Sequence, residues 1–194
     1  MTKKGSYAKG VVKREEILRR ALEVIARHGY RRTSVRELAD AVDLSQAGLL
    51  HYFASKEELF EAVLRKRDDI DRATYAPEGT SGLDTLVSIT RHNADVPGLV
   101  QLYAQLSTEA TDPDHPAHAF FATRYAQLRS ELADSIRTRQ AAGELAKQLD
   151  AEKLASITIA LADGLQTQWM LDPGLDMAEH IDYLWRLLSS TCAS

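Results

Sequence analysis

The sequence predicts an all-α protein of about nine helices, with a three-helix head followed by a longer helical body. Apolar residues recur at the three- and four-residue spacing of helices along most of the chain. Helix start signals, in which Ser or Thr is followed three residues later by Glu, recur in the first third. No stretch shows the sustained alternation of a strand. The 194 residues, 44% apolar and 27% charged, are enough for one good core or two small ones.

The head begins with a helix that ends near Gly29, and a second, short helix follows. A helix leaves its first four backbone N–H groups without partners. Thr33 or Ser34 can cap one of them, and Ser34 with Glu37 has the spacing of a capping box. The buried face of this helix is predicted to consist of Val35, Leu38, Ala39 and Val42.

A turn at Asp43 and Leu44 leads to a third helix, which we expect from Gln46 to about Tyr52, capped by Ser45. Its seven residues rise only about 10 Å. Leu49 and Phe53 should point inward. The side chains expected outward or at the rim are Gln46, Ala47, Leu50, His51 and Tyr52. Two helices joined by a tight turn, with the second exposed, form a device for placing side chains in a DNA groove.

Gly48 lies in the middle of this short helix, where glycine costs about 1 kcal/mol relative to alanine. One interpretation is a close approach of the backbone to phosphate. The other is a tolerated glycine, or close packing on the preceding helix. The sequence leaves both interpretations open.

The fourth helix starts at a second capping-box pattern, Ser55 with Glu58, and continues beyond Leu64. Loops and turn residues then divide the body into five further helices. We expect these over residues 83–96, 99–110, 117–142, 150–171 and 176–190. The domain boundary is placed after the third helix. Residues 1–54, with a basic N-terminal tail, would form the helix-turn-helix domain, and residues 55–194 the body for ligand binding and dimerisation.

Charge is divided unevenly between these parts. Residues 1–67 carry 15 Lys and Arg against 9 Asp and Glu, and residues 68–194 carry 9 against 19. The respective net charges of +6 and −10 agree with −4 for the chain. Both halves would pass as ordinary solvated surfaces if charge stood alone. A basic segment that coincides with a helix-turn-helix favours binding of nucleic acid.

Other features bound the class of protein. Cys192 is the single cysteine, so no internal disulfide can form, and a reducing cytoplasm is the expected setting. The N-terminus lacks the apolar segment of a secretory signal, and no apolar run is long enough to span a membrane. The phosphate-binding, dinucleotide-binding, hydrolase and metalloprotease motifs are missing. We therefore expect no catalytic residue, no cofactor and no metal.

Residues 14–64 resemble the N-terminal domain of TetR-type transcriptional regulators. The matching segments are Gly29-Tyr30, residues 33–39, residues 44–46, residues 49–53 and residues 55–59. Two positions depart from the family pattern. Asp43 stands in the turn where glycine is usual, but Asp tolerates the left-handed conformation better than most residues. Leu50 stands where an aromatic residue is common, so one hydroxyl contact to phosphate would be missing.

The resemblance implies roles in binding a double-stranded DNA operator. Thr33, Tyr52 and Lys56 would contact phosphates. Gln46 would contact a base edge, since an amide can pair with adenine in the major groove. The complete predicted DNA-binding set is Thr33, Ser34, Arg36, Ser45, Gln46, Ala47, Gly48, His51, Tyr52 and Lys56. The basic residues that precede it would follow the DNA backbone, enter the minor groove, or belong to a disordered solubilising tail; these are Lys3, Lys4, Lys9, Lys13 and Arg14.

The last two helices carry apolar residues on more than one face, enough for a second contact. One face would pack within the chain and the other against a second copy, giving a four-helix bundle across a two-fold axis. Packing within the chain alone is the alternative. The resemblance favours a homodimer, whose two heads would bind a palindrome. The predicted dimerisation residues are Ile157, Leu161, Leu165, Ile181, Leu184, Trp185 and Leu188.

The middle helices are expected to hold an unknown small-molecule effector, because apolar sites between helices with a few polar groups suit small molecules. The candidate ligand-binding residues are His92, Tyr103, Phe121, Tyr125, Gln166 and Trp169. Each is also explained by a place in the core or on the surface. The resemblance implies repression that the ligand relieves, and activation is the alternative.

Two other classes of protein remain as rivals. His115 and His118, with Asp112 and Asp114 nearby, have a spacing that can bind a metal, as an enzyme or metal carrier would require. Pro116 and the loop setting favour a turn with capping acids instead. A helical adaptor that uses the helix-turn-helix against protein is the second rival, and it predicts no salt-dependent affinity for DNA.

Overall fold

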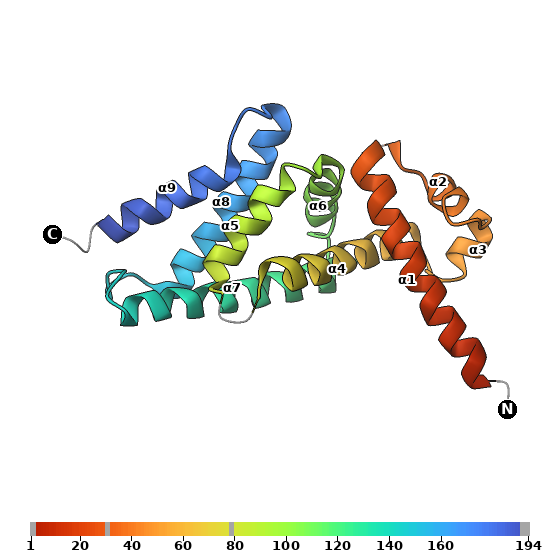
Figure 1. Ribbon diagram of the computed structural model, residues 1–194, viewed down its shortest axis with the longest axis horizontal. Coiled ribbons are helices and arrows are strands. Elements are labelled where there is room, and N and C mark those ends of the chain that lie inside the picture. Colours follow the sequence, from red (N-terminus) through yellow and green to blue (C-terminus); the bar gives the residue numbers. More distant parts are fainter. Residues whose placement is uncertain (1–2, 30–31, 78–79, 191–194) are drawn as a thin grey trace. The chain divides into compact units, whose positions relative to one another are not determined.

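The computed structural model describes residues 3–29, 32–77 and 80–190, with the backbone alone described at residues 3–8 and 190. Within these ranges the chain forms nine α-helices and no strand, which confirms the predicted all-α class (Figure 1). The helices are α1 (Lys3–His28), α2 (Val35–Asp40), α3 (Gln46–Leu50), α4 (Lys56–Tyr75), α5 (Gly82–Asn93), α6 (Pro97–Glu109), α7 (His118–Ala141), α8 (Ala151–Leu171) and α9 (Met177–Ser190).

Several helix ends differ from the sequence expectation. α1 begins at Lys3, so the described part of the basic lead-in is helical rather than a tail without structure. α3 ends at Leu50, two residues earlier than predicted, and His51 is its C-cap. α6 starts at Pro97, which occupies the first turn because a missing N–H costs nothing there. Cys192 lies outside the described residues.

The chain contacts divide it into two compact units. The first contains residues up to Ile70 together with Val96–Ala117, and the second contains Asp71–Asp95 and the chain from His118 onward. The first unit therefore holds most of α4 and all of α6 in addition to the predicted head. The boundary after residue 54 remains a prediction about which segment binds DNA.

In the first unit, α4 and α6 are attached to α1. The start of α4 is buried through Leu59, Phe60 and Val63. The Lys66 ammonium lies 2.6 Å from the Glu15 carboxylate on α1. These contacts explain why α4 packs with the head rather than beginning a separate domain.

α1 and α6 cross very closely at Gly98. A methyl group on Gly98 would lie 2.0 Å from the backbone oxygen of Ile25 and 2.9 Å from the Cα of Gly29. Real Cβ atoms do not approach backbone oxygen this closely. Glycine is therefore required at this crossing by steric contact alone, with no need for an unusual backbone angle.

In the second unit, α7 and α8 pack against each other, α5 packs on α7 and α9, and α8 packs on α9. Helix starts are fixed locally: Ser81 caps α5 by accepting from the Asp84 N–H, and Asp150 caps α8 by accepting from the Lys153 N–H. The predicted helix from Asp150 to Leu171 is confirmed. α7 and α8 are joined at one end by an ion pair in which Arg137 lies 2.6 Å from Glu152.

None of the helices in the described ranges has the length and apolar content needed to cross a lipid bilayer.

The Gly98 crossing generates the first prediction. Gly98→Ala should lower the free energy of unfolding by about 1–3 kcal/mol, because the added methyl group forces α1 and α6 apart. Thermal and urea denaturation would measure the loss. Gly10→Ala is the matched control on α1, where an added Cβ meets nothing within 4 Å. The control should raise stability by up to about 1 kcal/mol, since alanine is the better helix former. Equal stability of Gly98→Ala and the parent protein would contradict the crossing.

Candidate nucleic-acid interface

The first helix of the motif, α2, starts at the predicted capping box. The Glu37 N–H donates to the Ser34 Oγ at 3.1 Å, and the Ser34 N–H donates to the Glu37 carboxylate at 2.7 Å. The same two contacts lower the pKa of Glu37, first because its carboxylate accepts the backbone N–H of Ser34. The side chain is therefore ionised at neutral pH, where its negative charge favours the start of the helix.

The turn after α2 depends on Asp43, whose φ of 56° is the one positive φ among the described non-glycine residues. The Asp43 N–H donates to the Asp40 carbonyl at 3.3 Å, and the Leu44 N–H donates to the Ala39 carbonyl at 2.9 Å. These are the two bonds of a Schellman helix end. The predicted left-handed turn at Asp43 is confirmed.

Lys13 on α1 completes this turn from outside. Its ammonium donates to the Val42 carbonyl at 3.1 Å and to the Glu16 carboxylate at 2.8 Å. A lysine at the C-terminal end of a helix pairs with carbonyl groups that have no partner within the helix. Lys13 therefore holds the helix-turn-helix as well as contributing positive charge.

α3 is held by its cap and by the burial of one face. The Gly48 N–H donates to the Ser45 Oγ at 3.0 Å. Leu49 and Phe53 are buried, as predicted, and the guanidinium of Arg14 lies over the Phe53 ring at 4.7 Å. A methyl group on Gly48 would lie 3.3 Å from the Ser45 Oγ, so packing on the cap is one reason for glycine there. The predicted approach to phosphate stays a prediction.

The opposite face of α3 is open, as the sequence predicted. Gln46, Ala47, Leu50 and His51 are exposed, and Tyr52 is half-buried with its ring edge-on to His51 at 5.9 Å. Leu50 stands 41% exposed although it is a large apolar residue. Five of the predicted DNA-binding residues thus form one surface with a cap, an amide, a glycine backbone and two rings; these are Ser45, Gln46, Gly48, His51 and Tyr52.

The flanking residues differ in their availability. Arg36 is exposed and lies 3.9 Å from Asp40, a contact too loose to hold it. Lys56 is exposed at the start of α4 and lies over the Phe60 ring at 5.4 Å. The Ser34 hydroxyl accepts a hydrogen bond in the capping box and keeps its own hydrogen for donation.

Thr33 is the predicted contact that the structure places least favourably. It is 4% exposed, and its hydroxyl donates to the Gly29 carbonyl at 2.8 Å. A phosphate contact would require the hydroxyl to leave that bond. Its predicted role as a phosphate ligand therefore remains untested, and a structural role at the end of α1 is what the geometry shows.

The start of α4 departs slightly from the expected capping box. The Glu58 N–H donates to the Ser55 Oγ at 3.0 Å, as predicted. The Glu58 carboxylate instead accepts from the Ala54 N–H, at 2.6 Å, one residue before the cap. The two bonds still fix the short connection between α3 and α4.

The basic lead-in is only partly exposed. Lys9 is exposed, whereas Lys13 and Arg14 are half-buried and engaged with the motif. The side chains of Lys3 and Lys4 lie outside the described residues. Val11 and Val12, which were not singled out in the sequence, are 49% and 68% exposed on the same helix. A pair of adjacent valines in a charged segment was the signal available for finding them.

The residues predicted to bind an effector are divided between the units. Tyr103 is buried on α6 in the first unit, and His92 lies on α5 in the second, with its ring 5.4 Å from that of Tyr75. The other four belong to the α7–α8 pair: Phe121, Tyr125, Gln166 and Trp169. The sequence analysis missed Asp163, which accepts a hydrogen bond from the Tyr125 hydroxyl at 2.8 Å.

The predicted dimerisation residues have two kinds of environment. Leu165, Ile181 and Trp185 are buried within the chain, so the alternative of intrachain packing describes their present contacts. Ile157 is 56% exposed, and the remaining three, Leu161, Leu184 and Leu188, are half-buried. Tyr183 and Leu187 add exposed apolar surface on α9 that was not predicted. The assignment to a dimer contact stays a prediction.

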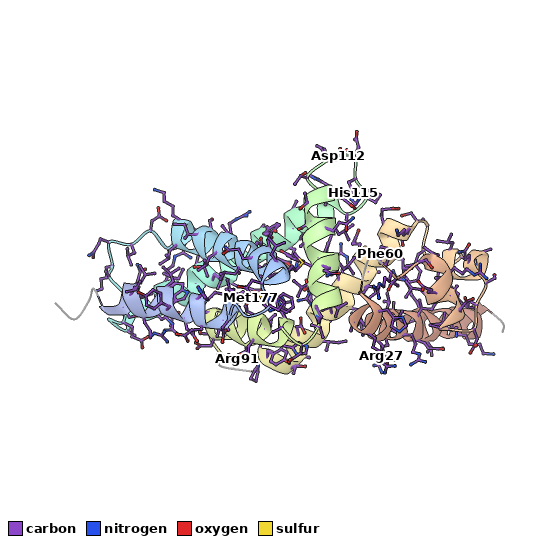
Figure 2. All side chains as sticks on the ribbon, turned by 90° about the horizontal axis from the view of Figure 1, so that it is seen from above. Arg27, Phe60, Arg91, Asp112, His115 and Met177 are labelled. Carbon is purple, nitrogen blue, oxygen red and sulfur yellow. The ribbon has the colours of Figure 1, made fainter. Side chains whose placement is uncertain are left out.

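The loop with His115 shows the turn chemistry that the sequence favoured (Figure 2). The Asp112 carboxylate accepts from the Asp114 N–H at 3.0 Å, and the His115 Nδ1 accepts from the Ala117 N–H at 3.1 Å. α7 begins at His118, just beyond this loop. Across the described residues, no three His, Cys, Asp or Glu side chains are grouped so that they would hold a metal ion.

Comparison with known proteins assigns both parts of the chain. The family model of bacterial regulatory proteins of the TetR family matches residues 17–63, and that of the C-terminal part of BetI-type transcriptional repressors matches residues 100–193. The HTH-type transcriptional repressor KstR2 of Mycolicibacterium smegmatis is 29% identical over 151 residues, covering 72% of this chain and 71% of that protein.

Solved structures agree with this assignment. A TetR-family transcriptional regulator from Rhodococcus sp. is 25% identical, with a TM-score of 0.72 over 91% of this chain and 98% of that one. A transcriptional regulator from Saccharomonospora viridis, solved in complex with choline, is 25% identical, with a TM-score of 0.68 over 89% and 93% of the two chains.

The chain therefore belongs to the TetR family of bacterial transcriptional regulators. It is a DNA-binding transcriptional repressor with a helix-turn-helix head, and it is not an enzyme. Binding to an operator and response to a small-molecule effector are typical of the family.

The turn of the motif generates the second prediction. Asp43→Gly should keep or raise the free energy of unfolding, by up to about 1 kcal/mol, because glycine adopts positive φ without strain. Asp43→Val should lower it by more than about 1 kcal/mol, because a β-branched residue is strained there. Thermal denaturation of both variants measures the difference. A valine variant as stable as the glycine variant would show that the turn is not left-handed.

Proposed function

We propose that this repressor binds a palindromic operator as a homodimer and is released from it by a small organic effector held in the second unit. The observation that carries the proposal is the open face of α3. Gln46, His51 and Tyr52 project from a helix whose opposite face is fixed by buried Leu49 and Phe53. A short, rigid helix that presents polar groups suits the major groove.

Within this interface we assign roles by chemistry. The Gln46 amide has the donor and acceptor needed to pair with adenine in the major groove. Lys56 and Arg36 offer positive charge to phosphates, and the cap hydroxyls of Ser34 and Ser45 offer donors. Phosphate contacts would fix position on the duplex, and Gln46 would select the sequence. An adaptor that binds protein through the same face has no observation in its favour.

The homodimer is proposed from the apolar surface left exposed on α8 and α9. Ile157 and Leu171 on α8 are 56% and 85% exposed, and Tyr183 and Leu187 on α9 are 56% and 48% exposed. A Cβ on Gly164, on the same side of α8 as Ile157, would meet nothing within 4 Å. Large apolar side chains exposed on neighbouring helices mark an interface, and a two-fold axis would make it self-complementary.

The effector is proposed to act by favouring one arrangement of the two heads. A ligand can shift binding only through a difference in its affinity for the two states, and such coupling is typically about 1–3 kcal/mol. Helix α4 contributes residues to both units and is the continuous element through which coupling would pass. Fold relatives were solved with lauroyl-CoA, with choline, and with isovaleryl coenzyme A and operator DNA. We place the protein in the cytoplasm, where its DNA target lies.

The third prediction separates base selection from phosphate binding. Gln46→Ala should relax discrimination among operator variants by about 1–3 kcal/mol at one position of each half-site. Lys56→Ala should weaken binding to all duplexes alike and reduce the salt dependence by about one counterion per head. Gel shifts with the chain's own upstream DNA and a scrambled duplex, at two salt concentrations, provide the measurement. Equal losses on both duplexes for both variants would refute the assignment of Gln46.

The fourth prediction tests the dimer. Ile157→Glu and Tyr183→Glu should each convert the dimer to a monomer, because a carboxylate would be buried without a partner at the interface. Light scattering at micromolar concentration measures the mass, and circular dichroism checks that the helices are retained. Gln148→Glu introduces the same charge at an exposed position of the α7–α8 loop and should leave the mass unchanged. A parent protein that is already monomeric would rule out this interface.

A further inference from the structure

Asp163 is a charge in an otherwise uncharged helix segment. Residues 154–171 contain no other Asp, Glu, Lys or Arg. The side chain is half-buried on α8 and accepts a hydrogen bond from the Tyr125 hydroxyl of α7 at 2.8 Å. A carboxylate among apolar residues is retained only with compensating partners. A single neutral hydroxyl is weaker compensation than a positive charge.

Gln166 lies one helical turn beyond Asp163, on the same side of α8. It is 8% exposed, and its Oε1 atom is buried with no hydrogen-bond partner. Two other described side-chain atoms share this condition, Ser135 Oγ and Trp185 Nε1, but only Gln166 neighbours the carboxylate in this way. A buried acceptor without a donor in a native protein calls for a partner that the chain itself does not supply.

Aromatic rings on α7 lie beside Asp163. Phe121 is buried one turn before Tyr125, and the centroids of these two rings are 6.4 Å apart. Phe120 packs edge-on to Phe121, with centroids 4.9 Å apart. The face of an aromatic ring carries negative potential, so it attracts a positive ligand.

These groups agree in sign. Asp163 supplies a negative charge, Gln166 an unpaired acceptor, and Phe121 and Tyr125 the electron-rich faces of their rings. The segments of the second unit, residues 71–95 and 118–194, carry 9 Lys and Arg against 14 Asp and Glu, a net charge of −5. A coenzyme A thioester brings several phosphate charges, which this environment would repel.

We propose that the effector is a small organic cation, a quaternary or protonated amine, recognised at the α7–α8 pair by Asp163, Gln166 and the rings of Phe121 and Tyr125. The proposal rests on the proposed function, and it names the chemical class of the effector. The ammonium group would lie against the Asp163 carboxylate and the rings, and a hydroxyl or N–H of the ligand would donate to Gln166 Oε1. Such a ligand supplies the positive charge and the donor that these side chains lack within the chain.

The test uses the full-length protein and four probes in titration calorimetry. The probes are tetramethylammonium, choline, the neutral isostere of choline with a tert-butyl group in place of trimethylammonium, and isovaleryl coenzyme A. Choline should bind more tightly than tetramethylammonium because its hydroxyl can donate to Gln166. The neutral isostere should bind at least about tenfold more weakly than choline, because it lacks the charge. Preference for the thioester, equal binding of the isostere, or no binding of either cation would overturn the proposal.

Two variants tie the binding to the named side chains. Asp163→Asn keeps an oxygen for the Tyr125 hydroxyl but removes the charge, and it should weaken choline binding about tenfold or more. Asp114→Asn makes the same change at an exposed position of the loop before α7 and should leave binding unchanged. Undiminished choline binding by Asp163→Asn would refute the role of the carboxylate.

Gln166→Met distinguishes a ligand contact from a structural one. Methionine has a similar volume and removes the unpaired acceptor, so the melting temperature of the unliganded protein should stay the same or rise. Choline binding should nevertheless fall severalfold. A loss of stability without a loss of affinity would assign Gln166 to the core.

A gel shift with the upstream operator separates this proposal from the proposed function. Retention of operator by the unliganded protein tests the repressor assignment and does not depend on the effector. Release of the retained operator by choline, but not by the neutral isostere, would support the cation. Release by isovaleryl coenzyme A alone would overturn the cation and leave the repressor assignment standing.

Discussion

The DNA-binding part of this protein depends on one constraint: α3 has five residues and cannot persist without external support. An isolated helix of that length is unstable in water because nucleation fixes several residues for each hydrogen bond gained. Here the Ser45 cap, the burial of Leu49 and the left-handed turn at Asp43 supply the support. Lys13 of α1 adds a bond to the Val42 carbonyl from outside the motif. The open face of α3 is rigid because everything behind it is fixed.

The second unit follows a different rule, since its packing includes polar groups that apolar packing does not explain. Tyr125 and Asp163 satisfy each other in part, but Gln166 Oε1 has no partner. A core selected for stability alone would replace such a group by an apolar residue of the same size. Retention of an unpaired acceptor beside a lone carboxylate is therefore better explained by function. Sites that bind small molecules commonly give up some stability in this way.

The two units also explain how one family can respond to different signals. The head is described by the same family model as other TetR regulators, and its caps and turn follow a pattern with few acceptable residues. The body has to preserve only helices and their packing, so the polar side chains between α7 and α8 can vary with the ligand. Fold relatives solved with choline and with acyl-coenzyme A thioesters show that this helical architecture accommodates both chemistries.

The sequence by itself determined the helices and the orientation of the head. Capping boxes, the Asp43 turn and the three- and four-residue spacing act over a few residues, so the buried and open faces of α3 followed from local pattern. Tertiary structure decided the rest. Only the α1–α6 crossing reveals why Gly98 must be glycine, and only the packing of α7 on α8 reveals Asp163 as the partner of Tyr125. It also buried Leu165, Ile181 and Trp185 within the chain. These contacts join residues far apart in sequence, and periodicity indicates that a face is buried without showing what covers it.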